Sequence, residues 1–333
     1  MKLYFLSLMV LFSAILFSCK NQENKNAQLN ATSSHSIVLG DTIFLDTAPK
    51  RISRKIRKMS NGNLIITSFD DVFLYDGNTF SPIPLPKDLD GYNAFDAIED
   101  SKGNFWIAST TSGLYKYDGS SFEHFTTKNG LVSDRVTSIY ERKNGELWVS
   151  TMEGISVIKE NDIQNITVRD GLTSGNVNTI IESNDGKMWI GTRGDINIID
   201  SQVDTIGIVR NVYEENFRNA WAFLEDPSGK MWMAGQSGIW RLDNGRYRPI
   251  SVEFNNSLHL DSKGNVWSTT PRGKIYNYES STLQNQSPGA KEIYTYDKML
   301  FNITEYKADI FFISGLDGVM KYDGAKMTPI KEK

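Results

Sequence analysis

The sequence has 333 residues, of which 36 are basic and 40 are acidic, so the net charge at neutral pH is −4. The two signs are interspersed and form no basic stripe, which argues against nucleic acid as a partner. With 11% aromatic residues, 26 glycines and only 9 prolines, the composition is typical of a turn-rich all-β chain that is long enough to bury a large core.

The N-terminus has the features of a secretory leader. Lys2 supplies a positive charge, and residues 3–17 form an apolar run, with two serines, that is short for a membrane span. The run ends in LFSC at 16–19, which resembles the lipobox of bacterial lipoproteins, where the cysteine is lipidated and becomes the new N-terminus. Cys19 is the only cysteine of the chain. We therefore predict a lipoprotein signal peptide over residues 1–18; an ordinary signal peptide is the alternative.

The next segment is expected to be a flexible tether. Residues 19–36 comprise the lipidated cysteine and a polar stretch that reaches on the order of 20–25 Å as a random coil. Aspartate after the cysteine favours retention at the inner membrane, whereas this chain has Lys20, so we expect a cell-envelope protein attached to the outer membrane, on its periplasmic or surface side. With Cys19 used as the anchor, the mature chain has no disulfide, thiol nucleophile or cysteine metal site.

Seven stretches of the remaining chain follow one plan, with a glycine turn, a strand centred on a large apolar residue, a small-residue turn and a second strand. The anchor residues of these strands are Ile65, Trp106, Trp148, Trp189, Trp232, Trp267 and Phe311. Their spacings are 41, 42, 41, 43, 35 and 44 residues, and five of the seven tryptophans fall on this register. Four short strands cannot hide both faces of one unit, so the units must stack around an axis. We predict an all-β, seven-bladed β-propeller with four antiparallel strands per blade over residues 37–333; an open solenoid is the alternative.

The second repeat illustrates the strands expected in each blade, named a to d from the channel outward. They are predicted at Ala94–Asp100, Phe105–Ser109, Leu114–Tyr117 and Ser121–Thr126. The a–b connections contain Asp, Asn and Gly, which is typical of hairpin loops with a glycine at positive φ rather than of calcium loops.

The repeats resemble the two-component regulator propeller repeat. The motif consists of Glu-Asp-x-x-Gly-Asn-x-Trp-Ile, then Gly-Leu-x-x-Tyr-Asp-Gly, and then linkers that read GLVSDRV at 130–136 and GLTSGNV at 171–177. The resemblance covers Ile52 to the C-terminus. In that family, propellers usually form the periplasmic sensing part of hybrid histidine kinases, often linked to polysaccharide breakdown products. This chain has no kinase domain, so the resemblance implies a propeller fold and a binding role in a standalone lipoprotein, without phosphotransfer.

A β segment precedes the first repeat. Residues 37–45 read IVLGDTIFL, yet blade seven already has a fourth strand near Lys326–Lys331. We predict that the N-terminal segment pairs with blade seven and closes the ring, covering a sheet edge that would otherwise invite aggregation.

Few residues offer catalytic or metal chemistry. His35 lies in the tether, His124 in an outer strand and His259 in an inner strand, where a core role is favoured over a ligand contact, so no two-histidine metal site is expected. GQSG at 235–238 lacks the spacing of a nucleophile elbow and lies in a repeat turn. DLDGYN at 88–93 could hold calcium weakly, but a solvated loop is favoured. No cofactor and no metal are expected.

The turns between strands b and c differ most among the repeats, and they share one face of a propeller with the linkers between strands d and a. A mixed-charge ring with aromatic residues in reach suits a polar ligand or a protein segment. The candidate ligand-binding residues on this face are Asp70, Tyr92, Glu153, Arg193, Arg218, Trp221, Arg272 and Asp317. Arg193 and Arg272 are the strongest candidates, because a guanidinium holds a carboxylate or sugar hydroxyls with several donors. The alternative is that these are plain exposed loops.

The favoured function is therefore a non-enzymatic, sensor-like binding lipoprotein of the bacterial envelope. Its partner would be a polar ligand, an oligosaccharide or a protein segment. Two alternatives stay open. One is a structural scaffold in an envelope assembly, and the other is a propeller enzyme such as a lyase or lactonase, which would need metal ligands converging on the channel.

Overall fold

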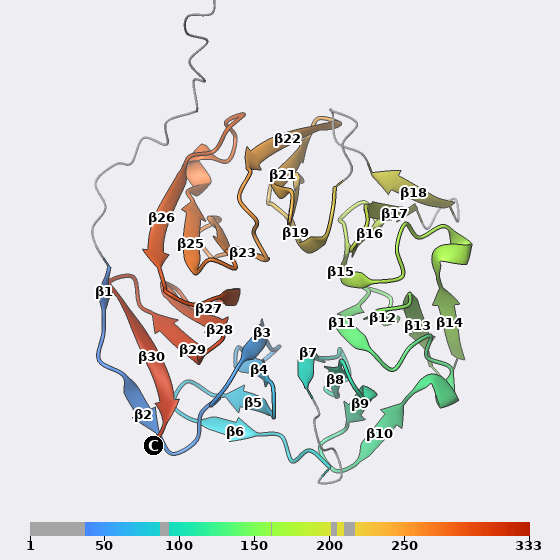
Figure 1. Cartoon of the computed structure of the whole chain (residues 1–333), viewed down its shortest axis with the longest axis horizontal. Coiled ribbons are helices and arrows are strands. Elements are labelled where there is room, and N and C mark those ends of the chain that lie inside the picture. The colour runs from blue at the N-terminus through green and yellow to red at the C-terminus, as the bar shows by residue number, and fades with distance from the viewer. Residues whose placement is uncertain (1–36, 87–92, 161, 201–204, 210–216) are drawn as a thin grey trace, which may run out of the picture. The chain divides into compact units, whose positions relative to one another are not determined.

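The seven repeats form seven four-stranded antiparallel sheets around a central channel (Figure 1). The computed structural model describes residues 37–86, 93–160, 162–200, 205–209 and 217–333. These ranges contain thirty strands and three short 3-10 helices, so the prediction of a seven-bladed, all-β propeller is confirmed. No helix within them is long and apolar enough to cross a bilayer. The predicted signal peptide, the lipidation site Cys19 and the tether lie outside the described residues.

Each blade takes its strands in chain order, from strand a beside the channel to strand d at the rim (Figure 1). Blade one comprises β3 (Ser53–Lys58), β4 (Leu64–Ser68), β5 (Val72–Tyr75) and β6 (Phe80–Pro82). Blade two comprises β7 (Ala94–Glu99), β8 (Phe105–Ser109), β9 (Gly113–Tyr117) and β10 (Phe122–Phe125). Blade three comprises β11 (Val136–Glu141), β12 (Leu147–Thr151), β13 (Ile155–Lys159) and β14 (Asp162–Ile166).

The remaining blades repeat the same order. Blade four comprises β15 (Val177–Glu182), β16 (Met188–Thr192), β17 (Ile196–Asp200) and β18 (Thr205–Val209). Blade five comprises β19 (Ala220–Glu225), β20 (Met231–Gly235), β21 (Gly238–Asp243) and β22 (Arg246–Ser251). Blade six comprises β23 (Ser257–Leu260), β24 (Val266–Thr269), β25 (Lys274–Tyr278) and β26 (Ala290–Thr295). Blade seven comprises β27 (Leu300–Lys307), β28 (Ile310–Gly315), β29 (Gly318–Tyr322) and β30 (Lys326–Glu332).

Blade two shows how closely the repeat pattern predicts the strands. Strand b has the predicted bounds, and the other three strands differ from the predicted bounds by one residue at one or both ends. Gly103, in the a–b hairpin, has a φ of +83°, as expected of a turn that requires the left-handed region. The period-two alternation and the turn residues therefore predict the local structure of a blade.

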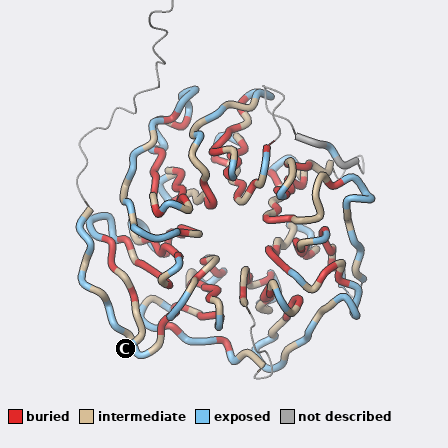
Figure 2. The backbone as a smooth tube through the Cα atoms, in the orientation of Figure 1, coloured by how far each residue is buried: buried red, intermediate tan, exposed pale blue. Residues whose placement is uncertain are grey.

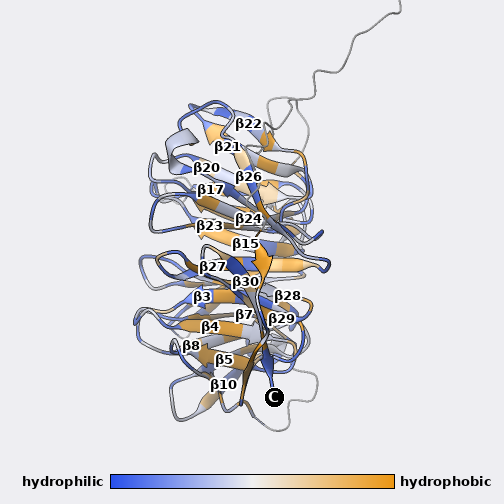
Figure 3. Ribbon diagram, turned by 90° about the vertical axis from the view of Figure 1, so that its left-hand side faces the viewer, coloured by the Kyte–Doolittle hydropathy of each residue, from blue (hydrophilic) through white to orange (hydrophobic). Residues whose placement is uncertain are grey.

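The core consists of seven apolar clusters, one between each pair of neighbouring blades. The tube view shows buried backbone in the inner strands of every blade and exposed backbone at the rim (Figure 2). From the side, the apolar residues follow the strands, and the loops are mostly hydrophilic (Figure 3). All seven anchor residues are buried. Burial of a tryptophan or phenylalanine ring contributes a few kcal/mol to the stability of the fold, at about 25 cal/mol per Å² of apolar surface.

The a–b hairpins hold the anchor tryptophans through aspartate. Asp226 accepts hydrogen bonds from the backbone N–H groups of Ser228 and Lys230 and, through Oδ2, from the indole Nε1 of Trp232 at 2.9 Å. Asp100 and Asp261 accept from their tryptophans in the same way. These carboxylates are engaged by the turn and by the buried indole, which agrees with the interpretation of these connections as hairpin loops.

Glutamates at the ends of inner strands join neighbouring blades. Glu141, at the end of β11 in blade three, accepts hydrogen bonds from the backbone N–H and the hydroxyl of Ser101 in the a–b hairpin of blade two. The same contact to the preceding blade is made by Glu99, Glu182, Glu225 and Glu305. Each such glutamate fixes the hairpin of one blade against the first strand of the next.

The linker motif GLxS follows strand d in blades two and three. Short 3-10 helices η1 (Thr127–Asn129) and η2 (Val168–Asp170) end at glycines with φ of 108° and 111°. The leucine that follows each glycine is buried between blades. The motif thus needs glycine for a left-handed helix end and leucine for an interblade contact. A third short helix, η3 (Ser280–Thr282), follows strand c of blade six.

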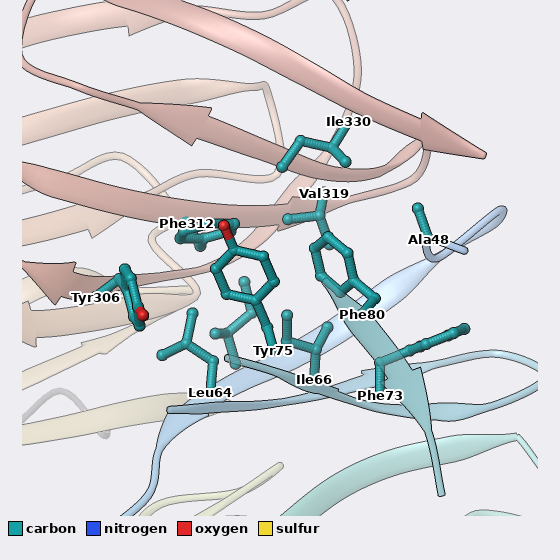
Figure 4. Packing of buried hydrophobic residues seen from close by; sticks show 11 residues of the cluster. Ala48, Leu64, Ile66, Phe73, Tyr75, Phe80, Tyr306, Phe312, Val319 and Ile330 are labelled. Carbon is teal, nitrogen blue, oxygen red and sulfur yellow. The ribbon is translucent and has the colours of Figure 1, made fainter. Parts of the chain in front are cut away.

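The N-terminal segment joins blade seven, as predicted. Strands β1 (Val38–Leu39) and β2 (Ile43–Leu45) both pair with β30, which makes them a fifth, outer strand of that blade. The pairing is parallel, unlike every other pairing in the ring. Ala48 follows β2 and is buried in the cluster between blades seven and one, where Tyr75 contacts Phe312 and the ring closes (Figure 4).

Candidate functional site

A β-bulge in the innermost strand places one extra residue near the end of the channel. Blades one, two, three, four, five and seven each show a register shift at this point; in blade two, Ala94 pairs with Ser109 and Asp96 with Ala108, so Phe95 is the extra residue. A bulge re-aims a side chain and increases the local twist of its strand. In these six blades the bulge therefore directs one side chain to the same end of the channel.

These side chains occupy one register of the sequence, which we call the mouth position. It lies eleven residues before the anchor in blades one to six, as Phe95 lies before Trp106, and ten residues before it in blade seven. The mouth position is held by Arg54, Phe95, Thr137, Asn178, Trp221, Asn256 and Phe301. The anchor is buried in every blade, whereas the mouth position varies from a cation to amides and large rings, which is the variation expected of a binding surface.

Six of the seven mouth-position residues line one cavity of about 210 Å³, which we call the aromatic cup. The exception is Thr137, which is buried and donates a hydrogen bond to the Val177 carbonyl at 2.5 Å. The rest of the lining consists of Lys55, Phe254, Pro271 and Met299. Pro271 belongs to a b–c turn and Phe254 and Met299 to d–a linkers, so the cup opens on the face that the sequence selects.

Arg54 is held in the cup by aromatic rings. Its guanidinium carbon lies 4.4 Å from the ring centre of Phe301 and 5.3 Å from that of Phe95. Burial lowers the pKa of Arg54, and Nε is covered without a hydrogen-bond partner. Arg54 forms no ion pair with any residue in the described ranges.

The channel continues below the cup as a second cavity of about 470 Å³. Lys55 and Trp221 line both cavities and therefore mark the passage between them. In this passage Nε1 of Trp221 is covered and has no hydrogen-bond partner. The amides of Asn178 and Asn256, in contrast, donate to backbone carbonyls of the following blades.

A buried carboxylate below the cup ties three blades together. Asp96, in β7, accepts hydrogen bonds from Nε and Nη2 of Arg57 at 2.8 and 2.6 Å, from the Ser138 hydroxyl at 3.0 Å and from the Ile139 N–H at 3.1 Å. Burial opposes its charge, yet Arg57 and these hydrogen bonds hold the pKa of Asp96 below its usual value. Lys55 forms no ion pair with this carboxylate. Burial lowers the pKa of Lys55, although the nearby charge of Asp96 acts in the opposite direction.

Three acidic residues of the sequence-predicted set are already engaged by neighbouring side chains. Asp70 lies 3.6 Å from Arg51, and Asp317 accepts from the Tyr296 hydroxyl at 3.1 Å and also from Lys298. Glu153 accepts from the Ser133 hydroxyl at 3.4 Å. All three lie in b–c turns, on the predicted face, but outside the cup.

The basic members of that set and Trp221 lie on the same face. Arg193, Arg218 and Arg272 are exposed, and their guanidinium groups have no partner among the described residues. Among the predicted residues that the structure describes, Trp221 alone lines the cup. Tyr92 and the segment 88–92 of the weak calcium candidate lie outside the described residues.

His259 has a core role, as the sequence favours. Its Nε2 accepts the backbone N–H of Glu305 at 3.0 Å, and its ring meets Phe311 edge to face. Burial lowers the pKa of His259 to about 4, so the ring is neutral and joins blade six to blade seven. His124, in the outer strand β10, stacks on Tyr115 of the neighbouring strand β9. The described residues contain no group of three or more metal-ligating side chains.

Sequence reasoning missed most of the cup, including Arg54, Phe95 and Phe301. The signal in the sequence that could have found these residues is the distance between the mouth position and the anchor residue, because it is eleven residues in six blades. The most variable residues of the repeats lie in the turns, whereas the bulge displaces residues of the inner strand itself toward the channel end.

Comparison with known sequences places the chain in a family. Residues 13–326 match the model of the family described as a domain of unknown function, DUF5074. The chain belongs to this family. The match spans most of the propeller, and the description of the family assigns no activity. None of the curated proteins matches the sequence.

Solved structures share the fold at low sequence identity. An extracellular domain assigned to the hybrid two-component system BT3049 of B. thetaiotaomicron has a TM-score of 0.68 at 18% identity, covering 82% of this chain and 40% of that one. Virginiamycin B lyase from Staphylococcus aureus, solved with quinupristin, has a TM-score of 0.67 at 14% identity, covering 83% of this chain and 96% of the lyase. PorZ, a surface component of the type-IX secretion system of Porphyromonas gingivalis, has a TM-score of 0.62 at 15% identity, covering 89% and 48%.

These similarities establish the propeller fold. The chain spans about 40% of the length of the BT3049 domain, so it matches only part of that protein. The resemblance to two-component regulator propellers is thus supported by extracellular domains with the same fold, while the matching sequence family is DUF5074.

Proposed function

We propose that this protein is a non-enzymatic, sensor-like binding propeller that seats its ligand in the aromatic cup. The observation that carries the proposal is the convergence of six mouth-position residues on one cavity of about 210 Å³. Aromatic walls with a few convergent polar groups are typical of ligand sites. The exposed Arg193 and Arg272, on the same face, are proposed to contact parts of the ligand that extend beyond the cup.

The proposed location is the bacterial cell envelope, with a lipid on Cys19 as the anchor. The lipobox-like sequence supports the anchor, and Lys20 supports the outer membrane. A Cys19→Ser variant is expected to become soluble or to stay unprocessed, as measured by fractionation and by the mass of the mature chain. Membrane attachment and processing at wild-type levels would contradict a lipid anchor.

The binding proposal is tested by screening the full-length protein in detergent against arrays of oligosaccharides and peptides. A ligand of the cup is expected to bind the wild type and to lose at least roughly tenfold in affinity in a Trp221→Ala, Phe301→Ala double variant, because both rings line the cavity. The matched control is Phe122→Ala, which removes a ring from outer strand β10. Equal binding by wild type and double variant would place the ligand elsewhere, and turnover of the ligand would favour an enzyme.

A further inference from the structure

The lining of the cup has more hydrogen-bond donors than acceptors. Arg54 and Lys55 bring two cations, and none of the ten described residues that line the cavity is acidic. Nε of Arg54 and Nε1 of Trp221 are both covered and have no acceptor. Asn256, which could accept through its side chain, already accepts from the Thr269 hydroxyl at 2.8 Å.

Neither cation of the cup forms an ion pair with a carboxylate of the described residues. The nearby carboxylate of Asp96 already receives four hydrogen bonds, from Arg57, Ser138 and Ile139. Lys55 forms no side-chain hydrogen bond and no ion pair in the described part of the chain, and burial disfavours its charge. Partly buried charges in proteins are usually paired, so two cations without a partner among the described residues favour an anionic ligand at the channel mouth.

The walls of the cup select an apolar body for that anion. Phe95, Phe254 and Phe301 line the cavity together with the indole of Trp221. A volume of about 210 Å³ is below the range of roughly 300–1,000 Å³ usual for drug-sized ligands, so the cup accommodates one ring with a short acidic arm.

From this arrangement we infer that the cup binds a carboxylate carried by an aromatic or bulky apolar group. The inference rests on the proposed binding function and specifies its ligand. The carboxylate has two acceptor oxygens, which can take hydrogen bonds from the terminal nitrogens of Arg54 and from Nζ of Lys55. These nitrogens have no partner in the described structure, and unlike Arg54 Nε they keep contact with solvent. The ring of the ligand lies against the phenylalanines.

The test uses two probes of the same shape that differ in charge. The binding of 3-phenylpropionate and of 3-phenylpropionamide to the full-length protein in detergent is measured by calorimetry at constant ionic strength. The acid is expected to bind roughly ten- to a hundredfold more tightly than the amide, because only the acid forms charge-assisted hydrogen bonds. Equal affinity for both probes would overturn the inference while leaving the cup as a binding site, and no binding of either probe at millimolar concentration would also overturn it.

Substitutions assign the preference to the two cations. Lys55→Met keeps the apolar stem and removes the charge, and Arg54→Gln removes the guanidinium; each is expected to reduce the preference for the acid to less than about threefold. The matched control is Lys58→Met. Lys58 belongs to the same strand, β3, but it lines the second cavity below the cup and not the cup itself. The assignment would be overturned if the Arg54→Gln, Lys55→Met double variant kept the preference for the acid. It would also be overturned if Lys58→Met abolished that preference to the same extent.

A second pair of probes distinguishes two sources of the carboxylate. Octapeptides that end in phenylalanine, with a free or an amidated C-terminus, are compared with the small acid. Tighter binding of the free peptide than of 3-phenylpropionate would identify a peptide chain end, and the reverse order would identify a free aromatic acid. Failure of this inference is separate from failure of the proposed function, because the array screen does not depend on a charged probe.

Discussion

The two ends of the central channel use polar residues in opposite ways. At the a–b end, Asp100, Asp226 and Asp261 accept from the indoles of three anchor tryptophans, and glutamates such as Glu141 join one blade to the next. At the mouth, Arg54 Nε and Trp221 Nε1 are covered without a partner, and Lys55 has no counter-ion in the described residues. Because both ends are built from the same repeats, the difference separates residues that stabilise the ring from residues that are available to a ligand.

This comparison predicts that substitutions at the a–b end change stability and that substitutions at the mouth change binding. A buried donor that loses its acceptor costs about 1–3 kcal/mol, and more where the acceptor is charged. At the mouth, the side chains of Arg54, Lys55 and Trp221 form no hydrogen bond within the described residues, so shortening them loses none. The following experiments test the contrast, beginning with the largest expected effect on the free energy of unfolding.

Asp226→Ala is expected to lower the free energy of unfolding by about 3–5 kcal/mol, because Trp232 loses its acceptor and the hairpin loses its N–H bonds. Denaturant titration followed by tryptophan fluorescence measures the change. The control Asp118→Ala removes an exposed carboxylate that accepts two turn N–H bonds and no indole, and should cost clearly less than Asp226→Ala. Equal costs for the two variants would remove the special role of the indole bond.

Deleting residues 37–46 should lower the melting temperature by several degrees, because β30 loses its parallel partner and an open edge remains. For a chain of this size, that shift corresponds to a loss of about 2–3 kcal/mol in the free energy of unfolding. Calorimetry of wild type and deletion measures the shift. Phe44→Ser is the control: its side chain is exposed, so the backbone pairing stays and the melting temperature should hold. An unchanged melting curve in the deletion would show that the N-terminal segment does not stabilise ring closure.

His259 should make stability fall as the pH falls. Its folded-state pKa of about 4 lies below the ordinary 6.5, so the unfolded chain binds the proton more readily; the contribution is complete above pH 6.5 and is lost toward pH 4. By pH 5 the loss is about 2 kcal/mol. The difference in unfolding free energy between wild type and His259→Gln, measured from pH 7.5 to 5, isolates this contribution from the carboxylates. Parallel curves for the two proteins would refute it.

Arg193→Ala combined with Arg272→Ala should leave the melting temperature within about one degree, since both side chains are exposed and neither has a partner in the described residues. Binding of a ligand selected on the wild type should weaken roughly ten- to a hundredfold, as for the loss of charge-assisted hydrogen bonds. Full-strength binding would place the ligand away from these turns, and a large fall in melting temperature would show that the two arginines support packing.

The sequence alone determined the ring. The anchor register, the glycine turns and the segment 37–45 predicted seven blades, their strands and the N-terminal pairing, because apolar periodicity and turn chemistry act over a few residues and recur in every repeat. The same repetition showed which face carries the variable b–c turns. For that reason the repeat pattern is sufficient to place Trp221, Arg193 and Arg272 on one face.

Only the tertiary structure decided which side chains meet. A bulge moves Arg54 and its equivalents from the inner strand to the channel mouth, and Asp96 is saturated by residues of two other blades, 39 and 42 residues away. These contacts cross blades, so no local pattern encodes them. Whether a charge is paired or left for a ligand depends on distances between separate repeats, and closing the ring is what sets those distances.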